Sequence, residues 1–274
     1  MTQTGTVWAN GDAYERFMGR WSRRIAERFA DGLDASPGLR WLDVGCGTGA
    51  LSGAVLERWA PASLVGVDPA EGFLEVARAR LADLGDTVRF ERADAAALPL
   101  PDASVDAVVS GLVLNFVDSP ERAVAEMTRV LAPGGLVAIY QWDFTGGMPL
   151  LELFWDAAVA LDPAVAPLHE DAKFGHWTPA FLRALLTGAP GVAATSVVVE
   201  PIEVAAVFAD FDDYWTPFLG GQGPGPSYAM SLDDARRSQL REQLRGALPV
   251  AADGTITLTL RAWKAVARTV GGAA

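Results

Sequence analysis

Apolar and polar positions alternate along residues 35–140 in a repeating order. Short apolar runs with the length of buried strands are separated by longer stretches in which apolar residues recur every three or four positions, as in helices. This alternation of strand and helix predicts a parallel sheet with right-handed crossover connections. The predicted strands are residues 41–44, 63–67, 87–91, 104–110 and 136–140.

The helices between these strands have recognisable ends. Residues 14–29 are amphipathic, and their large apolar side chains recur every four positions, so this face is expected to pack on the sheet. Residues 50–59 form a second helix, and a third begins at Asp68. Ser119 is expected to cap a fourth helix, with Pro120 at its first position. The apolar stripe of the first helix consists of Phe17, Trp21, Ile25 and Phe29.

The pattern of the second half is less regular. The expected elements are a loop at 141–148, an apolar helix at 150–161, an irregular stretch at 162–177, a helix from the cap Thr178 to 186, and a strand at 194–199. Residues 210–248 then carry an aromatic run and a flexible loop at 219–226. A helix is expected from Leu232, with Ser231 and Asp234 as its capping box.

The most informative segment is the glycine-rich turn after the first strand, LDVGCGTGA at residues 42–50. Gly45, Gly47 and Gly49 have no Cβ, so the backbone can turn sharply and approach a ligand closely. The helix that follows offers unpaired N–H groups and its positive dipole end to an anionic group. Asp43 can hold a cation at the same place. Together these features predict a ligand with a carboxylate and an ammonium group, as in an amino acid.

The same glycines leave a second interpretation open. Gly45, Gly47 and Ala50 also satisfy the fingerprint of dinucleotide-binding proteins. Asp68, at the end of the next strand, would accept hydrogen bonds from ribose hydroxyls in either case. Asp94 follows the third strand and precedes small residues, which suits an adenine amino group and a flat ring. The glycine turn alone is therefore also compatible with an NAD(P)-binding oxidoreductase.

Five pieces of the sequence resemble, in order and spacing, the class I S-adenosylmethionine-dependent methyltransferases of the small-molecule type, similar to type 11 and type 25 domains. The pieces are LDVGCGTG, VGVDPA, ERADAAALP, VDAVVSGLVLNFVDSPERAVAEMTRVLAPGG and LVAIY. They cover roughly residues 10–140. A nicotinamide dehydrogenase would not need the last three, so the resemblance favours the methyltransferase.

The resemblance implies a Rossmann-like α/β fold. Three αβα layers would surround a seven-stranded, mostly parallel sheet, whose last strand, at 255–262, is antiparallel. Residues 1–274 would form a single methyltransferase domain with a cofactor-binding core at 35–140. The stretches 141–193 and 208–250 would be cap insertions that bind the substrate.

The resemblance also implies roles for individual residues, with S-adenosylmethionine as the cofactor. Asp43, Gly45 and Gly47 would hold its methionine part. Asp68 would hold its ribose and Asp94 its adenine. The first helix would close over the cofactor. The residues expected at the cofactor are Tyr14, Arg20, Asp43, Gly45, Cys46, Gly47, Asp68, Pro69, Asp94, Ala95 and Ser110.

Methyl transfer is an in-line displacement, for which an enzyme mainly has to align the reactants and exclude water. Aromatic residues in the late stretches favour a hydrophobic or aromatic small-molecule acceptor. His169 and His176 are candidates for a general base, and Asn115 for contact with the acceptor. A non-catalytic S-adenosylmethionine-binding protein is a second alternative, and other chemistry at the sulfonium a third. The acceptor, the methylated atom and the oligomeric state are left open.

Composition and charge exclude several classes. The net charge of −12 over 274 residues argues against nucleic acid as a partner, because binding to phosphates requires a basic surface. No apolar run reaches the roughly 20 residues of a membrane helix, and residues 1–12 lack the features of a secretory signal. We therefore expect a cytoplasmic protein without a membrane span. Cys46 is the single cysteine, so no internal disulfide can form, and we expect no metal site.

Overall fold

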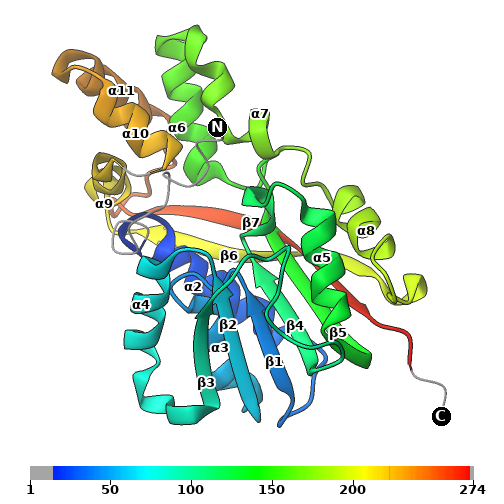
Figure 1. Ribbon diagram of the computed structural model, residues 1–274. Coiled ribbons are helices and arrows are strands. Elements are labelled where there is room, and N and C mark those ends of the chain that lie inside the picture. Colours follow the sequence, from blue (N-terminus) through cyan, green and yellow to red (C-terminus); the bar gives the residue numbers. More distant parts are fainter. Residues whose placement is uncertain (1–14, 222, 272–274) are drawn as a thin grey trace. The chain divides into compact units, whose positions relative to one another are not determined.

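A seven-stranded sheet organises the chain, with the strand order β3-β2-β1-β4-β5-β7-β6 (Figure 1). The computed structural model describes residues 15–221 and 223–271. β1 is parallel to its neighbours β2 and β4, β3 is parallel to β2, and β5 is parallel to β4. The strand order reverses at β1, which is where open α/β sheets bind ligands. The strands are β1 (Arg40–Val44), β2 (Ser63–Asp68), β3 (Val88–Arg92), β4 (Val105–Gly111), β5 (Leu131–Trp142), β6 (Val198–Phe208) and β7 (Ile256–Arg268).

β7 joins the sheet in the antiparallel direction. Gly134 N donates to Val270 O (3.2 Å) and Asp143 N donates to Arg261 O (3.0 Å), so residue numbers rise along β5 as they fall along β7. The predicted Rossmann-like fold with an antiparallel last strand is therefore confirmed. β7 is longer than predicted, because alternation between buried and less buried positions continues toward its end.

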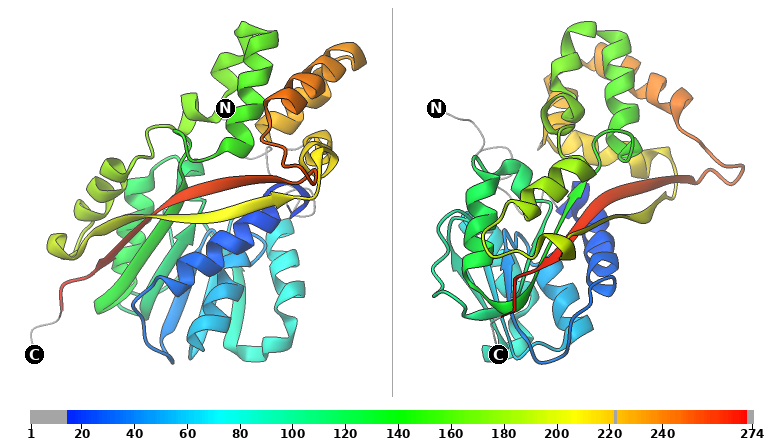
Figure 2. Two further views of the ribbon diagram at one scale, coloured as in Figure 1. Left: turned by 180° about the vertical axis from the view of Figure 1, so that it is seen from behind. Right: turned by 90° about the vertical axis from the view of Figure 1, so that its right-hand side faces the viewer.

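Helices lie on both faces of the parallel part of the sheet. α2, α3 and α4 cover one face, and α5 and α8 cover the other (Figure 1 and Figure 2). A π-helical turn (Glu15–Gly19) leads into α2. The helices are α2 (Arg20–Asp31), α3 (Ala50–Trp59), α4 (Glu71–Arg80), α5 (Pro120–Arg129), α6 (Pro149–Leu161), α7 (Glu170–Phe174), α8 (Pro179–Thr187), α9 (Phe211–Trp215), α10 (Pro224–Ser231) and α11 (Asp234–Ala247).

The described residues divide into two compact units. The sheet unit consists of Ser22–Gln141, Trp177–Ile202 and the described part of Ala262–Ala274. The helical unit consists of Trp142–His176 and the described parts of Met1–Trp21 and Glu203–Arg261. Residues 177–193 of the first expected cap thus lie in the sheet unit. The single domain with caps at 141–193 and 208–250 stays a prediction.

The apolar stripe at the first helix packs as its spacing predicts. In the sheet unit, Ile25 and Phe29 are fully buried, and the Phe29 ring lies 4.5 Å from the ring of Tyr140 in β5. In the helical unit, Trp21 contacts the ring of Phe208 in β6 (5.2 Å).

The strand predicted at 194–199 is wrong. Residues Ala194–Ser196 form a 3₁₀ turn, and β6 begins only at Val198. The Ser196 hydroxyl donates to Ala193 O (2.7 Å) and accepts from Arg268 N (2.9 Å). These local bonds satisfy the backbone in a turn, which is how serine competes with a strand ladder.

The predicted irregular stretch at 162–177 and the predicted flexible loop at 219–226 are also wrong in part. The first contains a 3₁₀ helix (Pro163–Leu168) and α7, and Asp162 starts the 3₁₀ helix by accepting a hydrogen bond from Ala164 N (3.0 Å). The second ends inside α10, which begins at Pro224. Proline at a first helical position is well tolerated, so Pro224 is a helix start.

Two predicted helix caps are wrong. Asp233, one residue before Asp234, caps α11 by accepting from Arg236 N (2.8 Å), while the Ser231 hydroxyl bonds elsewhere. The Ser119 side chain makes no capping hydrogen bond at α5. The predicted cap at Thr178 is confirmed, since its hydroxyl accepts from the third residue of α8 (3.2 Å).

The sheet predicts opposite effects for two glycine-to-alanine changes. A Cβ at Gly66 in β2 would lie 2.5 Å from the Phe90 ring, so Gly66→Ala should destabilise the protein by about 1–3 kcal/mol. Gly53 lies in α3, where a Cβ meets only an ordinary contact at 3.8 Å. Gly53→Ala should therefore stabilise by up to about 1 kcal/mol. Urea unfolding measures both, and equal effects would contradict the packing at Gly66.

Candidate functional site

The glycine turn is held against the end of β2. Gly45 N and Cys46 N both donate to Val67 O, at 2.7 Å and 3.0 Å. Gly45, Gly47 and Gly49 have φ values of 72°, 52° and 80°, in the left-handed region that favours glycine. The turn therefore needs the glycines, and it lies at the carboxyl ends of β1 and β2.

Two of these glycines face different surroundings. A Cβ at Gly45 would lie 2.4 Å from Val113 Cγ1, so the residues after β4 pack directly on the turn. A Cβ at Gly47 would meet no atom of the described residues within 4 Å, its two chain neighbours aside. Gly47 therefore borders open space, where a ligand could approach its backbone.

Asp43 in β1 has one carboxylate oxygen in use and one unused. Its Oδ2 accepts a hydrogen bond from the Ser52 hydroxyl at 2.7 Å. Its Oδ1 is buried and has no hydrogen-bond partner among the residues that the structure describes. Burial raises the pKa of Asp43 to about 7, the Ser52 hydrogen bond opposes that rise, and the nearby Asp68 carboxyl adds to it. A ligand cation would satisfy Oδ1 and favour the ionised carboxylate.

Asp68, at the end of β2, braces the turn from the other side. Its Oδ2 accepts from Gly47 N (3.1 Å) and its Oδ1 accepts from Ala70 N (2.8 Å). Burial raises its pKa, and these two backbone hydrogen bonds oppose the rise. The next residue, Pro69, is exposed.

Asp94 and Ala95 follow β3 at the same edge. Ala93 N donates to Asp68 O (3.2 Å), which ties the end of β3 to the end of β2. Asp94 is exposed, and its carboxylate accepts from Ala96 N (2.8 Å), while Ala95 is buried. The three predicted acids thus lie at or next to the carboxyl ends of adjacent strands, as the sequence interpretation requires.

Cys46 and Ser110 have packing and bracing roles. Cys46 packs with Leu74 and Phe90, and burial raises the pKa of its thiol, so it is uncharged near neutral pH. Ser110, at the end of β4, donates its hydroxyl hydrogen bond to Val44 O at 2.8 Å. This bond fixes the end of β4 to the end of β1. Cofactor contact for both residues stays a prediction.

Sequence reasoning missed the residues that shape the edge of the site after β4. Leu112 has a φ of 61°, a strained value for a leucine, and its N–H donates to Tyr140 O (2.9 Å). Val113 lies on Gly45, and the buried Gln141 amide bonds to the following segment. The contacts between the segment after β4 and the residues of β5 become visible only in the structure, because β5 lies well beyond that segment in the sequence.

Asn115, the candidate acceptor contact, belongs to that segment. It is half-buried in a short 3₁₀ turn (Leu114–Phe116) directly after β4. Once the Gln141 amide is oriented to satisfy its neighbours, its nitrogen donates to Asn115 Oδ1 at 2.9 Å. The structure thus holds Asn115 at the carboxyl edge of the sheet unit.

Arg20 has a partner within the helical unit. Its guanidinium donates to both carboxylate oxygens of Asp213 (2.9 Å and 3.2 Å) and lies over the rings of Trp21 and Phe208. Contact between Arg20 and a cofactor carboxylate stays a prediction, and it would compete with Asp213. Tyr14 lies outside the described residues.

The two histidines also belong to the helical unit. His169 caps α7, because its Nδ1 accepts from Asp171 N (3.1 Å), and His176 is exposed. Between them, Glu170 is buried and accepts a hydrogen bond from the indole of Trp155. Burial raises the pKa of Glu170 to about 7. A role of either histidine as a base stays a prediction.

Most of the aromatic residues expected to line an acceptor pocket are buried against one another in the helical unit. The rings of Phe154 and Phe218 stack at 4.4 Å, and both are fully buried. The Tyr214 hydroxyl donates to Leu150 O (2.9 Å). These contacts make the group the apolar core of this unit, so it gives little information about the acceptor.

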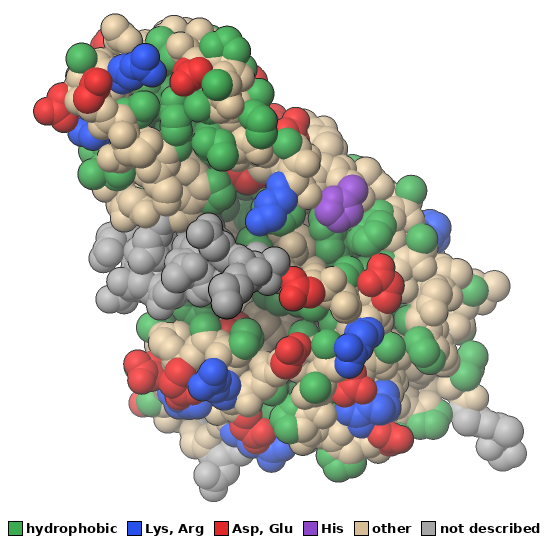
Figure 3. All heavy atoms as spheres, turned by 45° about the horizontal axis from the view of Figure 1, so that its top comes forward, with side chains coloured by type: hydrophobic (Ala, Val, Ile, Leu, Met, Phe, Trp, Pro, Cys, Tyr) green, Lys and Arg blue, Asp and Glu red, His purple; other side chains and the backbone are tan. Residues whose placement is uncertain are grey.

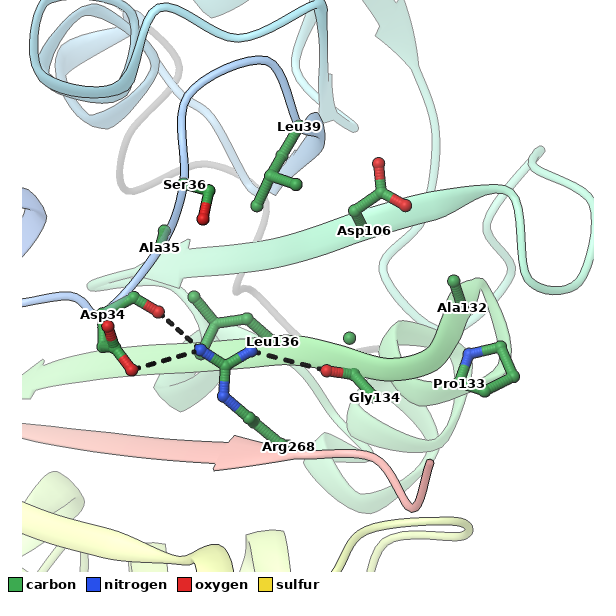
Figure 4. Close-up of a pocket in the computed structure, with 11 residues that line it drawn as sticks. Asp34, Ala35, Ser36, Leu39, Asp106, Ala132, Pro133, Gly134, Leu136 and Arg268 are labelled. Carbon is green, nitrogen blue, oxygen red and sulfur yellow. Dashed lines mark hydrogen bonds and ion pairs between the residues drawn. The ribbon is translucent and has the colours of Figure 1, made fainter. Parts of the chain in front are cut away.

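A cavity of about 380 Å³ lies at the opposite edge of the sheet unit, beside the amino ends of β1, β4 and β5 (Figure 4). Its charges are paired. Arg268 donates to Asp34 O (2.6 Å) and lies 3.5 Å from its carboxylate, while Asp106 binds Arg40 (2.6 Å). None of the predicted site residues lines this cavity, so we place the candidate site at the carboxyl edge.

Charge and metal-binding groups add little to the site. Figure 3 shows Lys or Arg and Asp or Glu interspersed on the face it presents. Within residues 15–221 and 223–271, no group of three or more His, Cys, Asp or Glu side chains could hold a metal ion. No helix in the same ranges has the length and apolar character needed to span a membrane.

Known proteins resemble the part of the chain that carries these residues. Residues 42–139 match the family model described as a methyltransferase domain. A demethylmenaquinone methyltransferase from Thermus thermophilus is 41% identical over 124 residues, which are 45% of this chain and 54% of that protein. A malonyl-acyl-carrier-protein O-methyltransferase from Methylococcus capsulatus is 36% identical over 118 residues, which are 42% of each chain.

The chain thus spans about half the length of these curated relatives. A solved structure of a candidate methyltransferase from Bacillus halodurans has the same fold, with a TM-score of 0.56 and 20% identity. That likeness covers 92% of this chain and 98% of the other.

The buried carboxyl of Asp43 predicts a pH-dependent loss of stability. Its raised pKa means that the folded protein keeps a proton that the unfolded chain releases between about pH 4 and pH 7. The free energy of unfolding should therefore fall as pH rises through this range, by up to about 1.4 kcal/mol per pH unit for this group. Glu170 adds a fall of the same sign.

Asp43→Asn should remove the part of the pH-dependent fall in the free energy of unfolding that comes from Asp43. The part that comes from Glu170 should remain. Urea unfolding of both proteins without ligand, at about pH 5 and about pH 8, measures the difference. The variant should gain stability relative to the unmodified protein at the higher pH. A stability difference that stays constant with pH would contradict the raised pKa.

Proposed function

We propose, since residues 42–139 match the family model described as a methyltransferase domain, that this chain is an S-adenosylmethionine-dependent methyltransferase acting on a small-molecule acceptor. The matched residues include the glycine turn, Asp68 at the end of β2, Asp94 after β3, and the segment after β4. The resemblance inferred from the sequence is thus confirmed for this part of the chain.

The unused Oδ1 of Asp43 is the observation that carries the proposal. A buried carboxylate oxygen without a partner is costly, and a positively charged donor relieves that cost. S-adenosylmethionine has an ammonium group and a carboxylate on one carbon atom. Asp43 would hold the ammonium, and the N-terminus of α3 after Gly49 would face the carboxylate. The residues present therefore fit this cofactor.

The other acids fit the remaining parts of the same molecule. Asp68 lies 7% exposed at the end of β2, and its oxygens keep lone pairs for ribose hydroxyls besides the two backbone bonds. Asp94 is exposed after β3, where an adenine amino group can donate to it. Open space at Gly47 lets the ligand lie against the backbone.

When bound, the cofactor supplies a methyl group on a positively charged sulfur. The chain itself has to align the acceptor with that group and keep water away, which can supply about 7–11 kcal/mol of the barrier. Asp43 and the glycine turn would hold the methionine part of the cofactor. Asn115, held at the neighbouring edge, is the group that we propose contacts the acceptor. Aligning the acceptor and excluding water require neither a metal ligand nor a covalent intermediate on the protein.

A small-molecule acceptor is supported by relatives named for a demethylmenaquinone and a malonyl carrier-protein substrate. Because the chain spans about half of these relatives, the likeness supports a small-molecule acceptor and neither of these two substrates in particular. A hydrophobic or aromatic acceptor remains part of the proposal.

The NAD(P) alternative is disfavoured by the same carboxylate. A pyrophosphate at the glycine turn would place negative charge next to Asp43, whose unused oxygen needs a cation or a donor. A non-catalytic protein that binds S-adenosylmethionine would make the same proposed contacts with the cofactor. Only an assay of methyl transfer to an acceptor distinguishes such a protein from an enzyme.

Gly47→Ala should abolish binding of S-adenosylhomocysteine. A methyl group there would project into the open space of the site, although within 4 Å it meets no atom of residues 15–221 and 223–271 beyond its chain neighbours. The left-handed φ of 52° should cost about 1–2 kcal/mol of stability, which the fold can tolerate. Calorimetric titration measures the loss.

Gly38→Ala is the matched control for this experiment. Gly38 has a φ of 76° with nothing within 4 Å of an added Cβ, and it precedes β1 at the amino edge of the sheet. Its variant should lose similar stability and keep the binding. Equal binding by both variants would refute the proposed place of the cofactor.

A further inference from the structure

The side chain of Gln141 is buried against the segment that follows β4. Gln141 is the second-last residue of β5 and is 1% exposed. Its amide faces three polar atoms, the backbone nitrogens of Val113 and Leu114 and the Oδ1 atom of Asn115. All four residues belong to the sheet unit.

The two backbone N–H groups determine how the Gln141 amide is oriented. Both groups can only donate, so they require the amide oxygen, which accepts from Leu114 N (2.8 Å) and Val113 N (3.2 Å). The amide nitrogen of Gln141 then donates to Asn115 Oδ1 at 2.9 Å. This orientation is assigned from the hydrogen-bond network, and the opposite one would leave all three contacts unfavourable.

The orientation of Gln141 sets the polarity of Asn115. Because its Oδ1 accepts a hydrogen bond from Gln141, the Asn115 carboxamide keeps its NH₂ group directed away from Gln141. Asn115 is half-buried, and none of the described hydrogen bonds uses its Nδ2. The Asn115 side chain therefore presents its NH₂ group as a hydrogen-bond donor, while its oxygen faces Gln141.

This donor lies at the edge of the sheet unit that carries the glycine turn. Val113, two residues before Asn115, packs on Gly45, where an added Cβ would lie 2.4 Å from Val113 Cγ1. β4 is also the direct neighbour of β1, which leads into the turn. An acceptor positioned next to the proposed cofactor would therefore approach the 3₁₀ turn that holds Asn115.

We propose that Gln141 is a positioning residue that fixes Asn115 as a hydrogen-bond donor to an oxygen of the methyl acceptor. This inference rests on the proposed function and deepens it by naming an acceptor class. The acceptor has an acidic hydroxyl, as in a phenol or an enol, and binds as the oxyanion. A neutral amide donor stabilises a negative oxygen strongly, whereas an amine acceptor would direct N–H groups at the N–H groups of Asn115.

The transfer step balances with this assignment. The acceptor hydroxyl first loses its proton to solvent, and Asn115 stabilises the resulting oxyanion. A lone pair of that oxygen forms the new bond to the methyl carbon. The bond between methyl carbon and sulfur breaks, and its electron pair stays on sulfur, which becomes a neutral thioether. The donor lowers the pKa of the hydroxyl, which raises the fraction of acceptor that is ionised at neutral pH.

A pair of matched probes tests the proposal. The protein is saturated with S-adenosylhomocysteine and titrated with 4-nitrophenol and with 4-nitroaniline, which differ in an oxygen against an amino group. The unchanged protein should bind the phenolate about tenfold or more tightly than the aniline, the ratio expected for a hydrogen bond to a charged group. Absorbance should also show that bound 4-nitrophenol ionises at a lower pH than free 4-nitrophenol.

Two variants separate polarity from structure. Asn115→Asp keeps an oxygen for Gln141 but presents a second carboxylate oxygen to the ligand, so the preference should reverse in favour of the aniline. Gln141→Leu frees the Asn115 carboxamide to turn over, so the preference should shrink and the ionisation of bound 4-nitrophenol should return toward its free value. Both variants should keep the affinity for S-adenosylhomocysteine, which shows that the site is folded.

The outcomes distinguish this inference from the proposed function. If S-adenosylhomocysteine does not bind to the unchanged protein, the proposed function fails. If it binds, but the phenolate does not bind or is not preferred over the aniline, the donor assignment alone fails. An unaltered preference in Asn115→Asp would equally overturn it.

Discussion

Two hydrogen bonds to one carbonyl group hold the centre of this structure. Gly45 N and Cys46 N both donate to Val67 O, so the turn after β1 is fixed to the last part of β2. Asp68 directly follows Val67, and its carboxylate therefore reaches Gly47 N. Only glycines adopt the backbone angles of this turn at low cost. Its geometry places α3, the acids and the open space at Gly47 at one edge of the sheet.

Among the residues that the structure describes, two polar groups at that edge have no hydrogen-bond partner, and they have opposite character. Asp43 Oδ1 is a buried hydrogen-bond acceptor, and Asn115 Nδ2 is a donor held by Gln141. Most buried polar groups in proteins are satisfied internally, so an unsatisfied one that borders a ligand site is informative. The acceptor suits an ammonium group, and the donor suits an oxyanion. The proposed site would thus present groups of opposite character to the cofactor and to the acceptor.

The sequence predicted those parts of the structure that depend on interactions between residues close together in the chain. The helix at 50–59 and the fixed turn at Gly45 and Gly47 follow from glycine conformation and apolar spacing. The strand at 194–199 was wrong because the Ser196 hydroxyl bonds to the backbone of its own segment and of β7. Gln141 was missed because its partners lie in a segment far away in the sequence. The same holds for Arg20 and its partner Asp213.

We propose that the glycine turn with its unused Asp43 oxygen binds S-adenosylmethionine and not a dinucleotide. Calorimetric titration of the full chain with S-adenosylmethionine and, separately, with NADH and NADPH tests it most directly. We expect one binding site for S-adenosylmethionine and no binding of either dinucleotide. Binding of a nicotinamide dinucleotide without any binding of S-adenosylmethionine would contradict it.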